Sequence, residues 1–127
     1  DLGTINYSLN SYAGQMDVAI TALNLHDIYI NSGSEGATYF LKNIYKVLKP
    51  GGVFGIIDHA GNADADNNTL HRMDPAIAKQ LATDAGFEID AESDLLNNPN
   101  DDRTLHMRDE SLERNTDRFL LRLKKPA

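Results

Sequence analysis

The sequence contains no cysteine, and only 12 of its 127 residues are Lys or Arg. The absence of cysteine excludes disulfides, thiolate zinc sites and cysteine nucleophiles. The net charge of −7 argues against general binding to phosphate backbones, which needs clustered basic residues. No apolar run approaches the roughly 18 residues that a membrane-spanning helix needs. We therefore expect no nucleic acid and no membrane as partner, and a soluble protein, cytoplasmic by default, with a periplasmic location as the alternative.

The chain does contain enough apolar residues for one globular domain, because 41% of it is hydrophobic. Residues 18–23 are almost continuously apolar, which predicts a strand buried on both faces of a parallel sheet. After a polar turn at residues 31–33, apolar residues recur at helical spacing over residues 40–48. Residues 53–57 form a second apolar block. These elements predict a right-handed unit of strand, helix and parallel strand.

A second helix and two further strands are predicted in the rest of the chain. Asp74-Pro75 is a helix-start signal, and Gly86 is a helix-stop signal. Residues 87–92 and 119–124 alternate between polar and apolar, which is typical of half-exposed strands. Because the long segment between them has no helical pattern, we expect them to pair antiparallel. The predicted sheet therefore has the order first, second, last and penultimate strand, with the last strand antiparallel.

A helix that ends in Leu48-Lys49-Pro50-Gly51-Gly52 and leads into a strand resembles the second half of class I S-adenosylmethionine-dependent methyltransferases. A helix ending in Ala85-Gly86-Phe87 and a C-terminal strand pair follow in the same order. The resemblance covers residues 16–125 and implies an α/β fold, the C-terminal half of a Rossmann-like methyltransferase sheet with strand order 4-5-7-6. Three further segments are similar to a bacterial group of small-molecule methyltransferases: Asn24-Leu25-His26-Asp27, Asp58-His59 with Thr69-Leu70-His71-Arg72, and Thr116-Asp117-Arg118-Phe119.

The cofactor-binding elements of that family have no counterpart in the sequence. Class I methyltransferases hold S-adenosylmethionine at a Gly-rich turn after their first strand and at an acidic residue after their second. Here Gly51, Gly52 and Gly55 precede or interrupt a strand instead of following one. We therefore expect residues 1–127 to be a single partial domain without the cofactor half. Alone it is expected neither to bind S-adenosylmethionine tightly nor to transfer a methyl group.

Polar residues follow the two parallel strands, at the sheet edge where ligands of such folds gather. Methyl transfer needs an acceptor placed in line with the sulfonium, and a base if the acceptor must lose a proton. Imidazoles suit the base, and neighbouring carboxylates orient them. The candidates are Leu23 and Asn24 for the cofactor, His26 and His59 as catalytic residues, and Asp27 and Asp58 for the substrate. Capping of a turn by Asn24 and Asp27, with the two histidines solvated, is the alternative interpretation.

The pair His71-Arg72 is the candidate anchor for an anionic group of the substrate, since Arg binds carboxylates through two hydrogen bonds. A salt bridge at the start of the following helix, beside Asp74, is an equal alternative. A Mg or Zn site is a further alternative, because one loop carries hard ligands at Asp58, His59, Asp64, Asp66 and His71. No spacing matches a known ligand signature. The sequence therefore favours no metal and a solvated loop.

Two classes of function remain open from the sequence. The first is an enzyme that transfers a methyl group from S-adenosylmethionine to a small-molecule acceptor. The second is a non-catalytic α/β module for oligomerisation or binding. In either class the strand at residues 18–23 would present an open, apolar edge, so we expect a homo-oligomer that pairs through it. The antiparallel C-terminal strand pair disfavours a nicotinamide-dependent Rossmann enzyme.

Overall fold

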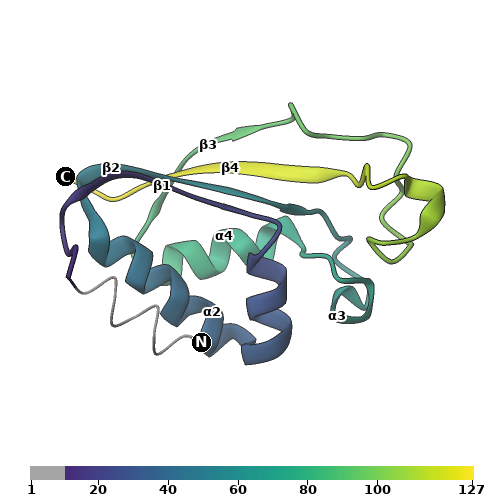
Figure 1. Cartoon of the computed structure of the whole chain (residues 1–127), viewed down its shortest axis with the longest axis horizontal. Coiled ribbons are helices and arrows are strands. Elements are labelled where there is room, and N and C mark those ends of the chain that lie inside the picture. Colours follow the sequence, from purple (N-terminus) through teal and green to yellow (C-terminus); the bar gives the residue numbers. More distant parts are fainter. Residues whose placement is uncertain (1–10) are drawn as a thin grey trace.

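The computed structural model describes residues 11–127, and the polar opening of the sequence, residues 1–10, lies outside this range. The described chain alternates strands and helices before a long loop leads to the last strand (Figure 1). The elements are β1 (Met16–Ala22), α2 (Leu25–Val47), β2 (Leu48–His59), α3 (Asn67–Leu70), α4 (Pro75–Asp84), β3 (Glu88–Ser93), a 3-10 helix (Glu110–Leu112) and β4 (Arg118–Lys124).

The four strands form one sheet in the order β1-β2-β4-β3. β1 and β2 are parallel, with Val18 opposite Val53, and β4 is antiparallel to both β2 and β3. This confirms the predicted α/β fold and the predicted strand order, including the antiparallel last strand. The parallel pair arises because α2 carries the chain back across the sheet between β1 and β2.

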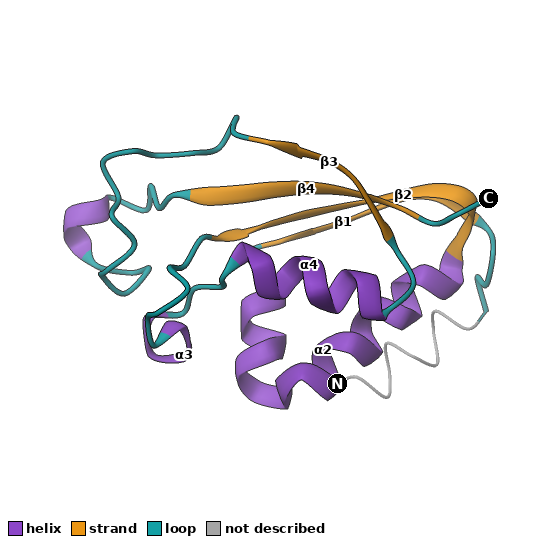
Figure 2. Cartoon of the chain, turned by 180° about the vertical axis from the view of Figure 1, so that it is seen from behind, coloured by secondary structure: helices purple, strands orange, loops and turns teal. Residues whose placement is uncertain are grey.

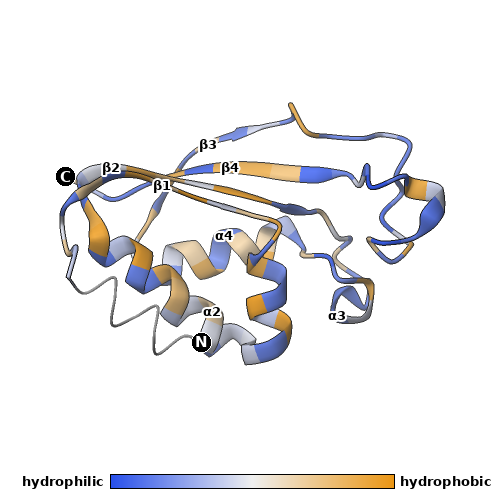
Figure 3. Cartoon of the chain, in the orientation of Figure 1, coloured by the Kyte–Doolittle hydropathy of each residue, from blue (hydrophilic) through white to orange (hydrophobic). Residues whose placement is uncertain are grey.

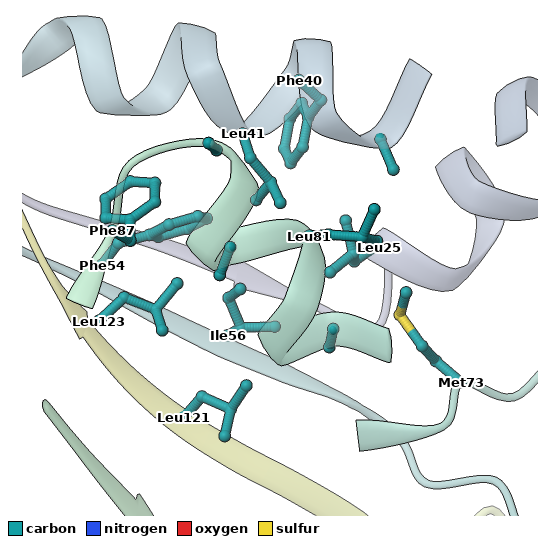
Figure 4. Packing of buried hydrophobic residues seen from close by; sticks show 14 of the residues in the cluster. Leu25, Phe40, Leu41, Phe54, Ile56, Met73, Leu81, Phe87, Leu121 and Leu123 are labelled. Atoms are coloured by element: carbon teal, nitrogen blue, oxygen red, sulfur yellow. The ribbon is translucent and has the colours of Figure 1, made fainter. Parts of the chain in front are cut away.

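The helices α2 and α4 cover one face of the sheet, as both views of the molecule show (Figures 1 and 2). Apolar side chains from the helices meet those of the strands between these two layers (Figure 4). Phe54 and Ile56 of β2 and Leu121 and Leu123 of β4 are almost fully buried there. Burying a side chain of this size stabilises the fold by about 1.5–3 kcal/mol, so this layer is the main source of stability.

The opposite face of the sheet has no helix over it in the described part of the chain (Figure 2). The strands β1, β2 and β4 are hydrophobic along much of their length (Figure 3). Val18 is 60% exposed and Ile20 is 71% exposed, both on β1 at the edge of the sheet. Among the described residues, β1 therefore leaves both an apolar face and a backbone edge open.

Helix α2 begins earlier than predicted. It starts at Leu25, directly after β1, whereas the sequence pattern predicted a turn at residues 31–33 and a helix from about residue 40. The difference arises at Gly33, whose backbone (φ 66°, ψ −168°) is not helical and forms a kink inside α2. Helical residues lie on both sides of this kink. The first part of α2 is thus a separate helical segment. It places the buried Leu25 and His26 against the end of the sheet.

Strand β2 is also longer than the predicted block at residues 53–57. It spans 12 residues and includes the Leu48-Lys49-Pro50-Gly51-Gly52 segment that the sequence pattern placed at the end of the preceding helix. Its far end pairs with β4, with Asp58 opposite Phe119 and His59 opposite Arg118. Both polar residues therefore belong to the strand rather than to the loop after it. No helix in residues 11–127 is long and apolar enough to cross a membrane.

Candidate functional site

The candidate site lies at the carboxyl ends of β1 and β2, and the fully buried Asp58 is at its centre. The two oxygens of this carboxylate accept three hydrogen bonds. The backbone N–H of His26 donates over 2.7 Å, and the backbone N–H of His59 donates over 2.8 Å. Nδ1 of His26 lies 2.6 Å from the same carboxylate. Asp58 thus joins the start of α2 to the end of β2.

His26 is held by Asp58 on one side of its ring and has no hydrogen-bond partner on the other. Burial alone would lower the pKa of this imidazole, but the hydrogen bond that Asp58 accepts from it and the charges of Asp58 and Asp27 raise the pKa above its ordinary value. Nε2 is buried and makes no hydrogen bond to any described residue. It lies 3.3 Å from Oδ1 of Asp27. That oxygen is also 3.3 Å from Nδ1 of His71.

His59 packs beside His26, with 5.3 Å between the ring centroids. Its Nδ1 is 2.6 Å from the hydroxyl of Thr116, while its Nε2 is buried and unpartnered among the described residues. Burial lowers the pKa of His59 to about 4, because the nearby Asp58 charge does not compensate for desolvation and the charges of His26 and two arginines add to the effect. The ring is therefore neutral at neutral pH.

A cavity of about 580 Å³ opens next to His59. Its wall combines apolar residues with three arginines that form no ion pair with a carboxylate in residues 11–127. Unpaired positive charge in one cavity is notable in a protein with a net charge of −7. It makes the cavity suited to a small anionic ligand with an apolar body. The lining residues are Leu23, His59, Met107, Arg108, Arg114 and Arg118.

Leu23 and Asn24, the predicted cofactor contacts, form the turn between β1 and α2. Leu23 lines the cavity and has a left-handed backbone (φ 58°), which is strained for a residue with a branched side chain. Its N–H donates to the carbonyl of Ile57, which fixes the turn against β2. Asn24 is exposed and starts α2, but its side chain makes no capping hydrogen bond. Its amide therefore remains available for a ligand.

The other predicted site residues divide into two groups. His26, Asp58 and His59 do come together, but His26 and Asp58 are buried behind the cavity and do not line it. The expected direct contact of Asp58 with substrate is corrected, because its oxygens are occupied by backbone and imidazole groups. Asp27 and His71 lie together at the surface, each about half exposed. They form a second cluster with Nε2 of His26.

Arg72 requires a correction, because it does not face solvent as an anchor for a substrate anion. Its side chain is buried and forms two hydrogen bonds with Asp101, of 2.8 and 3.0 Å. It also donates to the carbonyls of Ala60 and Leu105. The alternative interpretation, a salt bridge at the start of the following helix beside Asp74, is also wrong about the partner of Arg72. The acceptor is Asp101, which is distant in the sequence and could not be identified from spacing.

The five loop residues of the alternative metal site do not form one ligand group in the described chain. Asp66 caps α3 by accepting hydrogen bonds from Thr69. The group of His and acidic side chains close enough to share an ion is instead His26, Asp27 and His71. The sequence pattern did not single out Arg108 or Arg114 as site residues, because the acidic segment around Arg114 is typical of a solvated or substrate-covering loop. Arg118 had one signal, its place in the segment Thr116-Asp117-Arg118-Phe119.

Comparisons with known proteins identify the fold and leave the function open. No family model matches the sequence, and no curated protein matches it. Solved structures do match, among them the [4+2]-cyclase SpnF, with 17% sequence identity and a TM-score of 0.62 over 91% of this chain and 51% of that chain. A SAM-dependent methyltransferase from Methanosarcina mazei is 14% identical, with a TM-score of 0.61 over 91% of this chain and 61% of its own.

A third similar structure contains a product of the cofactor. It is the 1,6-didemethyltoxoflavin-N1-methyltransferase of Burkholderia thailandensis, with bound 1,6-didemethyltoxoflavin and S-adenosylhomocysteine. The identity is 15% and the TM-score 0.60, over 91% of this chain and 46% of that chain. The chain therefore has a partial Rossmann-like methyltransferase fold and spans about half to three fifths of the length of these three structures. Because one of them is a cyclase by name, the shared fold alone does not decide the reaction.

Proposed function

We propose that the chain is the substrate-facing half of a methyltransferase that uses S-adenosylmethionine to methylate a small anionic acceptor. The observation that carries this proposal is the cavity at the carboxyl ends of β1 and β2. It joins a neutral imidazole, His59, to three unpaired arginines on a methyltransferase fold. Fold and cavity chemistry support the proposal independently of each other.

In this proposal His59 is the general base. A proton on Nδ1, shared with the hydroxyl of Thr116, leaves Nε2 without a partner among the described residues, and a turn of the ring toward the cavity lets this nitrogen accept a proton from the acceptor. The low pKa of about 4 keeps His59 unprotonated at neutral pH. His26 is assigned a positioning role, because it is buried behind the cavity and joined to His59 through Asp58.

The three arginines define the acceptor class more closely than the resemblance does. Arg108, Arg114 and Arg118 are free of acidic partners in residues 11–127, so a carboxylate or phosphate on the acceptor would gain charge-assisted hydrogen bonds. Leu23 and Met107 supply apolar wall for the body of the molecule. Leu23 and Asn24 are assigned to the methionine end of the cofactor, since they lie at the end of β1 beside the cavity.

The proposal also includes a partner for the bare sheet face. A second copy of the chain is the occupant we assign to it, because β1 leaves its outer backbone edge open among the described residues and carries exposed Val18 and Ile20. The β1 strand of a second copy would supply N–H and C=O groups to the open edge and apolar side chains to the exposed face. A two-fold axis would satisfy the edges of both copies at once. A non-catalytic oligomerisation module is the second candidate function, and the same exposed surface is the observation that favours it.

Calorimetric titration with S-adenosylhomocysteine tests the methyltransferase proposal. The 127-residue chain is expected to bind it weakly or not at all, because the Gly-rich turn and the acidic ribose partner are absent from its sequence. The same chain extended by the upstream coding sequence is expected to bind in the micromolar range. Failure of the extended protein to bind would favour the non-catalytic module. Micromolar binding by the 127-residue chain would contradict the partial-domain assignment.

A further inference from the structure

A cluster of three potential ligands lies on the far side of His26 from Asp58. It comprises His26, Asp27 and His71, each of which has a ligand atom within 4.8 Å of those of the other two. Nε2 of His26 and Nδ1 of His71 each lie 3.3 Å from Oδ1 of Asp27. Residues of α2 and of the turn after α3 contribute to it, so only the folded chain brings it together. We propose that His26, Asp27 and His71 bind a divalent transition-metal ion of the Zn²⁺ type.

The buried nitrogen of His26 is the first argument. Nε2 has no hydrogen-bond partner among the described residues, and His26 is only 1% exposed. Leaving a buried polar atom unpaired costs about 1–3 kcal/mol, so such an atom calls for a ligand. A metal ion between Nε2, Asp27 and His71 satisfies it.

Asp58 is the second argument. Metal-binding histidines almost always hydrogen-bond through their other ring nitrogen, often to a carboxylate, which fixes the tautomer and the ring orientation. His26 has this arrangement, since Nδ1 is 2.6 Å from a buried oxygen of Asp58. A proton held at Nδ1 leaves the lone pair of Nε2 pointing away from Asp58. The carboxylate thus prepares Nε2 for coordination.

The spacing of the three atoms fits an ion of this size. Ligands at about 2.0–2.2 Å from the ion lie roughly 3.3–3.6 Å from each other in a tetrahedral site and roughly 2.8–3.1 Å apart in an octahedral one. Two of the separations already have the tetrahedral value, at 3.3 Å from Asp27 to His26 and 3.3 Å from Asp27 to His71. Asp27 and His71 are about half exposed, so their side chains can adjust to bring the third separation into range.

The donor set selects the kind of ion. Two imidazoles and one carboxylate suit zinc, iron, cobalt or nickel, whereas magnesium and calcium prefer oxygen ligands alone. Three protein ligands leave at least one coordination position for water or a ligand, as in catalytic rather than structural zinc sites. This set differs from the loop residues that the sequence suggested, and shares only His71 with them. Its key member, His26, comes from another element.

Titration of the full chain with Zn²⁺, and with Co²⁺ followed by visible absorption, tests the site. We expect one ion per chain and Co²⁺ bands of a site with nitrogen and oxygen ligands. Asp27→Asn and His71→Ala, both at half-exposed positions, are expected to weaken Zn²⁺ binding by at least the roughly 10–100-fold that loss of an outer partner costs. Circular dichroism of each variant verifies that the fold is intact.

His106→Ala is the matched control, because the His106 ring lies 5.0 Å from that of His71 but is outside the ligand group. It is expected to bind Zn²⁺ as the unmodified chain does. Equal loss in His106→Ala and His71→Ala would identify nonspecific chelation by surface histidines and overturn the proposal. Absence of binding at micromolar Zn²⁺ would overturn it too. Neither readout depends on S-adenosylmethionine, so failure of the metal site and failure of the methyltransferase proposal are separate results.

Discussion

Arg72 and Asp101 form a buried ion pair with two hydrogen bonds, of 2.8 and 3.0 Å, between side chains that are 0% and 1% exposed. Asp101 also accepts the backbone N–H groups of Arg103 and Asp117. The pair therefore ties the loop after β2 to the long excursion between β3 and β4. Since that excursion carries Arg108 and Arg114, the ion pair anchors the segment that builds one side of the cavity.

Removing one partner of this pair should be strongly destabilising. Asp101→Ala leaves the Arg72 guanidinium buried without its counter-ion, and we expect the free energy of unfolding to fall by about 3–5 kcal/mol. The control is Asp90→Ala, which breaks the exposed ion pair with Arg122 and should cost at most about 1 kcal/mol. Urea denaturation measures both. Similar losses in the two variants would show that burial of the Arg72 pair does not matter.

The same carboxylate makes stability depend on pH in the acid range. Burial alone would raise the pKa of Asp101, but hydrogen bonds from Arg72 and two backbone N–H groups hold it below its ordinary value of 3.8. A folded-state pKa below the unfolded one gives stability that is present above about pH 4 and is lost as the pH falls through the folded value. The unmodified chain should therefore lose stability more steeply below pH 4 than Asp101→Asn. Parallel curves in acid titrations followed by circular dichroism would contradict this.

Neutralising the cavity arginines should weaken anion binding. We expect Arg108→Gln and Arg114→Gln each to reduce affinity for a small aromatic carboxylate, with salicylate as the probe, by roughly 10-fold or more, since a hydrogen bond to a charged group contributes about 1.5–3 kcal/mol. Isothermal titration of the chain measures this without any cofactor. Arg122→Gln is the control, because Arg122 lies on β4 outside the cavity and pairs with Asp90. An equal effect of Arg122→Gln would indicate only a general charge effect.

A charge on the bare sheet face should prevent self-association. Ile20→Lys places an ammonium at a position that is 71% exposed on the edge strand β1, where burial in an interface would desolvate it. We expect light scattering to report a dimer for the unmodified chain and a monomer for this variant. Leu95→Lys, at an equally exposed apolar residue outside the sheet, should remain dimeric. A monomeric unmodified chain would refute the assigned partner.

Much of the fold was predictable because it depends on local patterns. Buried parallel strands are continuous apolar blocks, and half-exposed strands alternate, so the four strands could be located and their order in the sheet predicted from the sequence. The boundaries that failed depend on longer-range effects. Gly33 bends α2 where the polar residues before it suggested a turn. Pairing with β4 extends β2 as far as His59.

The strand pattern alone predicts that Asn24, His26, Asp58 and His59 lie near one sheet edge, because the carboxyl ends of parallel neighbouring strands meet there. Their burial and their contacts depend on the folded chain. In the folded chain His26 and Asp58 are buried behind the cavity. Arg72 contacts Asp101, which is 29 positions away in the sequence. Asp27 and His71 lie beside His26. The periodic spacing of apolar residues predicts which face of a helix or strand is buried. The partners of a buried charge are set by loop paths, which carry no periodic signal.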